Sequence, residues 1–327
     1  MLGGLRAALF LFLALQGTFA YTGSIILDKE SGCMKYLEKN PFIMIVVGVL
    51  GISMSAIFVR LSQAPSVITA ACRLIWTVLL MSPVVWGKTA CREELLRVGK
   101  KELLVCIVSG IFLAAHFTVW FESLKETSVA SSTAIVCTEV VWVALGFRLF
   151  MKGTISRKAW LCIAIALVGS MLIAFSDSSG QGGHLYGDLL ALLAAIAVAV
   201  YTLLGRIARK TMSTTVYTYV VYSACAVTLA ILTAVQGYSL SAFTPNAILV
   251  GLLLSVFSTI LGHSIFSWCL KYFSPAFVSA SKLCEPFVAS FVAVLLFREV
   301  PRALQVLGGV IVVAGVYLYS REERKAE

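Results

Sequence analysis

Long apolar runs separated by short polar stretches follow one another along this chain from residue 41 onward. A helix needs about 20 apolar residues to cross the roughly 30 Å hydrocarbon layer of a bilayer, and the runs reach that length. A β-barrel would instead show short segments of alternating apolar and polar residues. The pattern predicts an all-α integral membrane protein with ten transmembrane helices. The predicted segments are approximately residues 41–62, 66–87, 102–123, 128–150, 157–176, 186–209, 214–236, 246–271, 275–297 and 301–320.

The composition supports this prediction, because 60% of the 327 residues are hydrophobic and only 13% are charged. A soluble domain is typically about half apolar and could not hide so much apolar surface. The net charge of +10 comes from basic residues scattered through short linkers, without the basic stripe and interleaved aromatic side chains of a nucleic-acid interface. The chain is therefore expected to contact the lipid bilayer and no nucleic acid.

The first 33 residues are expected to lie outside the core of ten helices. They include a basic Arg6, a short apolar stretch and the sequence Thr-Phe-Ala before Tyr21, as in a signal peptide. An upstream extension is the alternative, with translation starting at Met34, because MKYLEKNP is a natural short basic lead into a first spanning helix. Both interpretations stay open.

Lysine and arginine in the short loops predict the orientation, because such loops are basic on the cytoplasmic side. Alternate loops are rich in basic residues, whereas the loops at 177–185 and 237–245 have none. Both ends of the ten-helix core should therefore be cytoplasmic in the cell membrane, with residues 88–101 and the tail 321–327 inside and residues 177–187 outside. The basic residues on the expected cytoplasmic side are Lys88, Arg92, Arg97, Lys100, Lys101, Arg148, Lys152, Arg157, Lys158, Arg206, Arg209, Lys210, Arg321, Arg324 and Lys325. Lys125, Arg298 and Arg302 are a minority on the other side.

The chain also repeats itself at an interval of 146 residues. The matching pairs are Leu124 and Leu270, Lys125 and Lys271, Ser128 and Ser274, Ala130 and Ala276, Glu139 and Glu285, and Gly169 and Gly315. Two similar halves are expected, at residues 34–176 and 186–320. Each has five helices, and because five is odd the second half enters the membrane from the opposite side. Inverted repeats are common in secondary transporters, whose substrate site lies near the midplane between them.

Three stretches carry a family resemblance: GISMSAIFVRLSQAPSVITAACRLIW, AAHFTVWFESLKETSVASSTAIVCTEV and GHSIFSWCLKYFSPAFVSASKLCEPFVASF. Over roughly residues 41–320 the chain resembles the drug/metabolite transporter superfamily, EamA branch. The resemblance implies a ten-helix carrier of a small metabolite such as an amino acid, a nucleoside or a drug-like solute, often an exporter. It does not identify the substrate, the direction of transport or the coupling ion.

The ninth segment holds the ionisable residues that are most unusual for a membrane helix. Lys282 and Glu285 are three residues apart, so they share a helix face and can pair. Pro286 removes a backbone donor and would bend the helix beside them. In the first half Glu139 is followed by Val140 instead of proline, which leaves a corresponding break in the fourth segment open.

Glu139 and Glu285 are the best candidates for a polar site or a proton carrier. A carboxylate inside a helix bundle is costly, faces an internal cavity and holds a proton more readily than it does in water. The alternative is structural, because either glutamate could form a fixed ion pair with Lys282 or Arg73 that locks two helices together.

Six further side chains are candidates for substrate binding or coupling. Arg73 lies deep in the second segment and needs an internal partner or an anionic substrate group. His116 and His263 occupy near-equivalent places in the two halves and could relay protons or simply join helices by hydrogen bonds. Trp120, Tyr201 and Trp268 would suit an aromatic-lined cavity, with a position in the interfacial aromatic belt as the alternative.

A membrane-embedded enzyme that uses the same buried carboxylates is the alternative function. The sequence has no HExxH, GxSxG or Walker-type phosphate loop, and its three histidines are too widely spaced to suggest a metal site. No CxxC pair suggests zinc. A transporter without a metal, cofactor or catalytic residue is therefore the expected function, with a small molecule as its partner, and assembly as a homodimer stays open.

Overall fold

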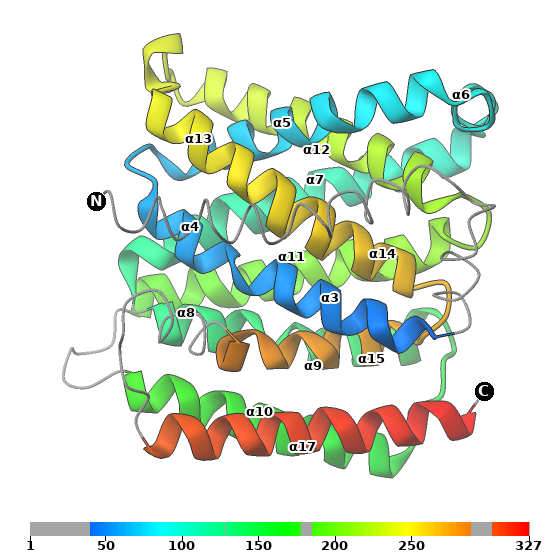
Figure 1. Ribbon diagram of the computed structural model, residues 1–327, viewed down its shortest axis with the longest axis vertical. Coiled ribbons are helices and arrows are strands. Elements are labelled where there is room, and N and C mark those ends of the chain that lie inside the picture. The colour runs from blue at the N-terminus through cyan, green and yellow to red at the C-terminus, as the bar shows by residue number, and fades with distance from the viewer. Residues whose placement is uncertain (1–39, 128, 178–184, 289–302, 327) are drawn as a thin grey trace.

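The computed structural model describes residues 40–127, 129–177, 185–288 and 303–326, and every regular element in these ranges is a helix. The helices lie side by side with their axes running in a common general direction (Figure 1). In the first half they are α3 (Pro41–Ser53), α4 (Ser55–Leu61), α5 (Ser66–Gly87), α6 (Thr89–Leu96), α7 (Lys100–Glu126), α8 (Val129–Val136), α9 (Glu139–Phe150) and α10 (Arg157–Asp177). In the second half they are α11 (Leu185–Ala208), α12 (Thr214–Val235), η1 (Leu240–Ala242), α13 (Pro245–Leu253), η2 (Leu254–Ser264), α14 (Ile265–Cys269), α15 (Pro275–Ser281), η3 (Lys282–Cys284) and α17 (Ala303–Ala326).

Eight helical segments in the described part of the chain are long and apolar enough to cross a membrane. They match the predicted segments one to four, six to eight and ten. Helix α10, with 21 residues, occupies the place of the fifth. The ninth begins at Pro275, and its course beyond Val288 lies outside the described residues, as does the predicted extension 1–33. The prediction of an all-α membrane protein is confirmed.

Local sequence explains where several of these helices begin. Pro41, Pro245 and Pro275 stand in the first turn of α3, α13 and α15, where a missing backbone donor costs nothing. Thr244 and Ser274 cap the last two by accepting hydrogen bonds from Ala247 N and Phe277 N.

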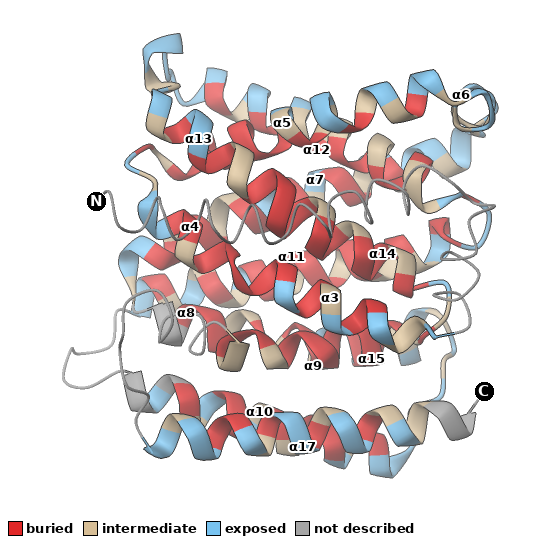
Figure 2. Cartoon of the chain, in the orientation of Figure 1, coloured by how far each residue is buried: buried red, intermediate tan, exposed pale blue. Residues whose placement is uncertain are grey.

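Figure 2 shows many exposed positions on the outer helices of the bundle. Large apolar side chains occupy many of these exposed positions. On α10 and α17, for example, Leu161 and Val310 are 62% and 60% exposed. A water-soluble protein would avoid such a surface, whereas lipid tails are as apolar as these side chains. The outer face therefore suits a bilayer.

The two halves pack with an approximate two-fold relation. The first segment of each half contacts the third segment of the other half, as the contacts of α3 with η2 and of α11 with α7 show. The second segment of each half also contacts the third segment of the other half, through α5 with α13 and α12 with α7. Three further contacts join equivalent segments of the two halves: α5 with α12, α9 with α15, and α10 with α17. This is the arrangement that a duplicated five-helix unit would give.

Glycines allow the closest of these crossings. A Cβ on Gly110 of α7 would lie 2.6 Å from the Val221 oxygen of α12. A Cβ on Gly169 of α10 would lie 2.7 Å from the Gly308 oxygen of α17. Side chains larger than hydrogen cannot fit at such distances, so the helix backbones are in direct contact.

Four of the membrane-spanning segments lose regular α-helical geometry near their middle. The first is interrupted at Met54, the fourth at Cys137–Thr138, the eighth becomes a π-helix at η2, and the ninth tightens to a 3₁₀ turn at η3. Irregular backbone at membrane depth is tolerated only against protein or a wet cavity. These interruptions therefore mark the part of the interior where a site is expected.

Candidate functional site

The fourth and ninth segments break opposite each other, next to Glu139 and Glu285. In the ninth segment Pro286 has no N–H to give to the Lys282 carbonyl, which accepts the N–H of Glu285 instead and produces the tighter turn. The Cys137 thiol of the fourth segment approaches the same carbonyl at 4.0 Å. The predicted irregularity beside Pro286 is therefore present.

The fourth segment breaks without a proline. Both the N–H and the hydroxyl of Thr138 bind the Ile135 carbonyl, at 3.0 and 2.6 Å. A threonine side chain that takes a carbonyl in this way competes with regular helix geometry. The break that the sequence left open at Glu139–Val140 is thus formed by the residue before Glu139.

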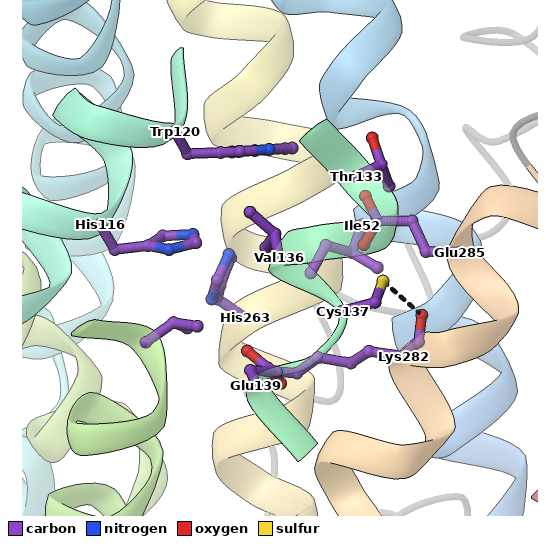
Figure 3. A pocket seen from close by; sticks show the side chains of 11 residues that line it. Ile52, His116, Trp120, Thr133, Val136, Cys137, Glu139, His263, Lys282 and Glu285 are labelled. Atoms are coloured by element: carbon purple, nitrogen blue, oxygen red, sulfur yellow. Dashed lines mark hydrogen bonds and ion pairs between the residues drawn. The ribbon is translucent and has the colours of Figure 1, made fainter. Parts of the chain in front are cut away.

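Lys282 pairs with Glu139, not with Glu285 as the helical spacing suggested. Lys282 Nζ lies 2.8 Å from Glu139 Oε1, and the two side chains are only 6% and 4% exposed. In Figure 3 the Lys282 side chain extends away from Glu285 and across to Glu139. The buried Glu139 carboxylate needs a counter-ion, and the lysine side chain is long enough to reach the other half of the protein. This ion pair matches the structural alternative considered for Glu139.

Glu285 has no direct counter-ion among the residues that the structure describes. It is 6% exposed, forms no ion pair with another described residue, and its Oε1 has no hydrogen-bond partner among the described residues. A buried carboxylate in this condition is expensive unless something else binds it.

Both glutamates face a common pocket, shown in Figure 3. Its narrow shape leaves room for roughly one water molecule, so a metabolite would enter only if the helices moved apart. The lining residues are Ile52, His116, Trp120, Thr133, Val136, Cys137, Glu139, Val198, His263, Lys282 and Glu285. Ile52 and Val198 are 146 residues apart, as Glu139 and Glu285 are, so the pocket lies where the halves meet.

Two histidines and a tryptophan form one side of the pocket. His116 donates its Nδ1 proton to the Ala194 carbonyl at 2.9 Å and stacks on Trp120 at a ring distance of 5.7 Å. The His263 ring lies 6.4 Å from that of His116. The Trp120 Nε1 and His263 Nδ1 atoms have no hydrogen-bond partner among the described residues. This side of the pocket offers unused polar atoms as well as flat ring surfaces.

Three of the predicted site residues lie outside the pocket lining. The Arg73 guanidinium stacks on the Phe117 ring at 4.0 Å and donates to Thr259 Oγ1 at 2.7 Å. Tyr201 binds Ser267 through their hydroxyls at 3.0 Å, with its ring 6.0 Å from that of His263. Trp268 is half-buried and packs on Tyr272 with a ring distance of 4.3 Å.

Several lining residues are not among those predicted from the sequence, and Thr133 is the most informative of them. Its hydroxyl is buried and has no partner among the described residues. The residue 146 positions later, Ser279, also has a buried hydroxyl without a described partner. The repeat interval, applied to small polar residues as well as to charged ones, would have found this pair. Among the described residues no three His, Cys, Asp or Glu side chains cluster closely enough to hold a metal ion.

Comparison with known proteins adds a family and a fold. The model of the EamA-like transporter family matches residues 40–175 and 185–321. A Salmonella typhimurium protein named as a probable amino-acid metabolite efflux pump is 25% identical over 294 residues, which cover 86% of this chain and 94% of that protein. The uncharacterized transporter YwfM of Bacillus subtilis is 26% identical over 227 residues, covering 67% of this chain and 73% of that protein. One solved crystal structure superposes with a TM-score of 0.69 over 87% of this chain and 98% of the other, at 16% identity, and so shows a shared fold.

Proposed function

Because the chain belongs to the EamA-like transporter family, we propose that it is a secondary transporter that exports a small organic metabolite by alternating access. The observation that carries the proposal is the pocket at the junction of the two halves. Broken helices surround it, together with buried polar atoms that have no hydrogen-bond partner among the described residues. The efflux pump named among its relatives supports the direction. The narrowness of the pocket fits a protein that must open to load its substrate.

Transport in vesicles tests this function. Purified protein reconstituted into lipid vesicles should move at least one solute of a metabolite panel faster than protein-free vesicles do, and a pH gradient should change the rate if protons drive the cycle. Equal rates with and without protein for every solute, under both gradients, would refute the transporter proposal.

Cysteine labelling tests the proposed orientation, with both core ends in the cytoplasm. Cys91 lies in α6, in the basic loop proposed to be cytoplasmic, and Ser241 lies in the exposed loop after α12. We expect an impermeant maleimide to label Ser241→Cys in intact cells, and to label Cys91 only after permeabilisation. The opposite result would invert the topology.

The labelling conditions matter, because burial raises the pKa of the Cys91 thiol, with Lys88 opposing the shift. The thiolate is the reactive form, so Cys91 should react slowly at neutral pH and faster as the pH rises. Permeabilised cells labelled at the same pH supply the control for reactivity. Ser241→Cys is measured in a Cys91→Ser background.

A further inference from the structure

Of the two carboxylates that line the pocket, one has an ion-pair partner among the described residues and the other has none. Besides two histidines and Cys137, one basic and two acidic side chains line the pocket: Lys282, Glu139 and Glu285. Lys282 forms an ion pair with Glu139, with 2.8 Å between Lys282 Nζ and Glu139 Oε1. Glu285 is therefore the carboxylate that lacks a counter-ion within 4.0 Å among the described residues.

Arg73, the other cation buried nearby, does not fill this role. Its guanidinium donates to Thr259 at 2.7 Å and to Ser55 at 3.4 Å, and it rests on the Phe117 ring. It does not line the pocket and forms no ion pair with a described residue. The short-range contacts of Arg73 are with neutral groups, so the Arg73 and Lys282 charges reach Glu285 only from a distance. Among the described residues the Glu285 carboxylate therefore has no ion-pair partner and is available to a ligand.

The groups around Glu285 suit a cation with an apolar body. In Figure 3 the Glu285 carboxylate and the Thr133 hydroxyl lie together on one side of the pocket, with the rings of Trp120 and His116 on the other. A carboxylate accepts hydrogen bonds only, and a hydroxyl can accept as well. An indole ring attracts cations to its face and packs against apolar groups. An anionic ligand would instead place a second negative charge beside Glu285.

We propose that the substrate carries a protonated amine, which Glu285 binds as its counter-ion with Thr133 as a second acceptor, while Trp120 contacts the apolar part. This inference rests on the proposed transport function and specifies the solute that the pocket selects. Lys282 shows that the same cavity already holds one ammonium group against a carboxylate, and the substrate would supply the second.

A binding experiment on the purified protein in detergent tests this proposal. The probes are primary amines, alkyl and aromatic, each compared with the alcohol and the carboxylate of the same skeleton, and binding is followed by thermal stabilisation. At least one amine should bind roughly tenfold or more tightly than its alcohol and carboxylate counterparts. Glu285→Gln should weaken the binding of that amine by roughly 10- to 150-fold and leave the alcohol unaffected, as expected for a hydrogen bond to a charged group.

Matched variants separate recognition from folding. Glu122→Gln changes the same side chain on the surface of α7, where it pairs with Lys125, and should bind the amine like the unmodified protein. If Glu285→Gln does not fold, Glu285→Asp and Thr133→Val take its place. Glu285→Asp should keep the preference for amines, whereas Thr133→Val should weaken amine binding.

The pH dependence supplies an independent readout. Protons compete with the amine for Glu285, so lowering the pH from 8 to 5 should weaken amine binding while the probe itself stays protonated. Lys282, Glu139, Cys137 and the two histidines also line the pocket, and the charge of Arg73 acts on Glu285 from further away. Protonation of a histidine would also weaken amine binding. Glu285→Gln should remove the part of the pH effect that belongs to the carboxylate.

The outcomes distinguish this proposal from the transporter proposal. If no amine binds more tightly than its alcohol, or if Glu285→Gln binds amines unchanged, amine recognition is refuted while vesicle transport of another solute would leave the transporter standing. If amines bind through Glu285 but no solute crosses the vesicle membrane, recognition stands and transport is refuted.

Discussion

Lys282→Met is expected to lower the free energy of unfolding by about 3–5 kcal/mol, because it leaves Glu139 buried without a counter-ion. Lys282 Nζ and Glu139 Oε1 are 2.8 Å apart, and both side chains are almost fully buried. Thermal unfolding of the detergent-solubilised protein measures the loss as a lower midpoint. The matched control is Lys125→Met, which removes an ion pair whose side chains are 42% and 41% exposed and should cost about 0–1 kcal/mol.

The double variant Lys282→Met with Glu139→Met decides whether the ion pair itself causes this loss. Replacing both partners of a buried pair by apolar residues of similar volume is often neutral or stabilising. The double variant should therefore recover most of the stability that Lys282→Met loses. If the double variant loses as much free energy of unfolding as the two single variants together, the loss comes from packing and not from an uncompensated charge.

Gly110→Val is expected to destabilise the protein by about 1–3 kcal/mol or more, because it forces α7 and α12 apart. The new Cβ would lie 2.6 Å from Val221 O, 2.7 Å from Ala224 Cβ and 2.9 Å from Cys225 N. Two of these atoms belong to the backbone and cannot turn away. Thermal unfolding again gives the measurement, and Gly110→Ala should already show part of the loss.

Gly87→Ala is the control for this prediction, since a Cβ there would meet nothing within 4 Å. Alanine is favoured over glycine in a helix by roughly 0.5–1 kcal/mol, so this variant should be neutral or slightly stabilising. Equal unfolding midpoints for Gly110→Val and Gly87→Ala would show that the α7–α12 contact is not as close as the structure has it.

The sequence predicts the helices of this protein well because the length of an apolar run is a direct physical requirement of the bilayer. Six of the side chains that the sequence singles out line one pocket: Glu139, Glu285, Lys282, His116, His263 and Trp120. Their role in binding stays a prediction. The repeat interval identifies the two glutamates as an equivalent pair, and equivalent positions in two inverted halves can meet at their junction. Arg73, which has no equivalent charged residue 146 positions later, does not line the pocket.

The directions of side chains were harder to predict. A helix that is apolar all round has no polar face to set its rotation, so Tyr201 and Trp268 could not be assigned to the pocket or to other contacts from their positions alone. The pairing of Lys282 depends on the distance between the fourth and ninth segments, which spacing within one helix does not contain. The break before Glu139 depends on the hydrogen bond of the Thr138 hydroxyl to the Ile135 carbonyl. A threonine hydroxyl commonly makes such a bond inside a helix that stays regular, so the presence of Thr138 does not predict the break.

The approximate two-fold relation has a mechanical consequence. Exchanging the two halves converts the contact of α3 with η2 into that of α11 with α7, but it returns the contact of α10 with α17 to itself. When the proposed transporter opens to the other side, a contact that the exchange converts into a different contact would have to change its geometry. A contact that the exchange returns to itself can persist unchanged. The backbone contact at Gly169 and Gly308 is of the second kind. Helices α10 and α17 would then keep the same packing in both states of the transporter. A covalent cross-link between them should therefore be compatible with a complete transport cycle.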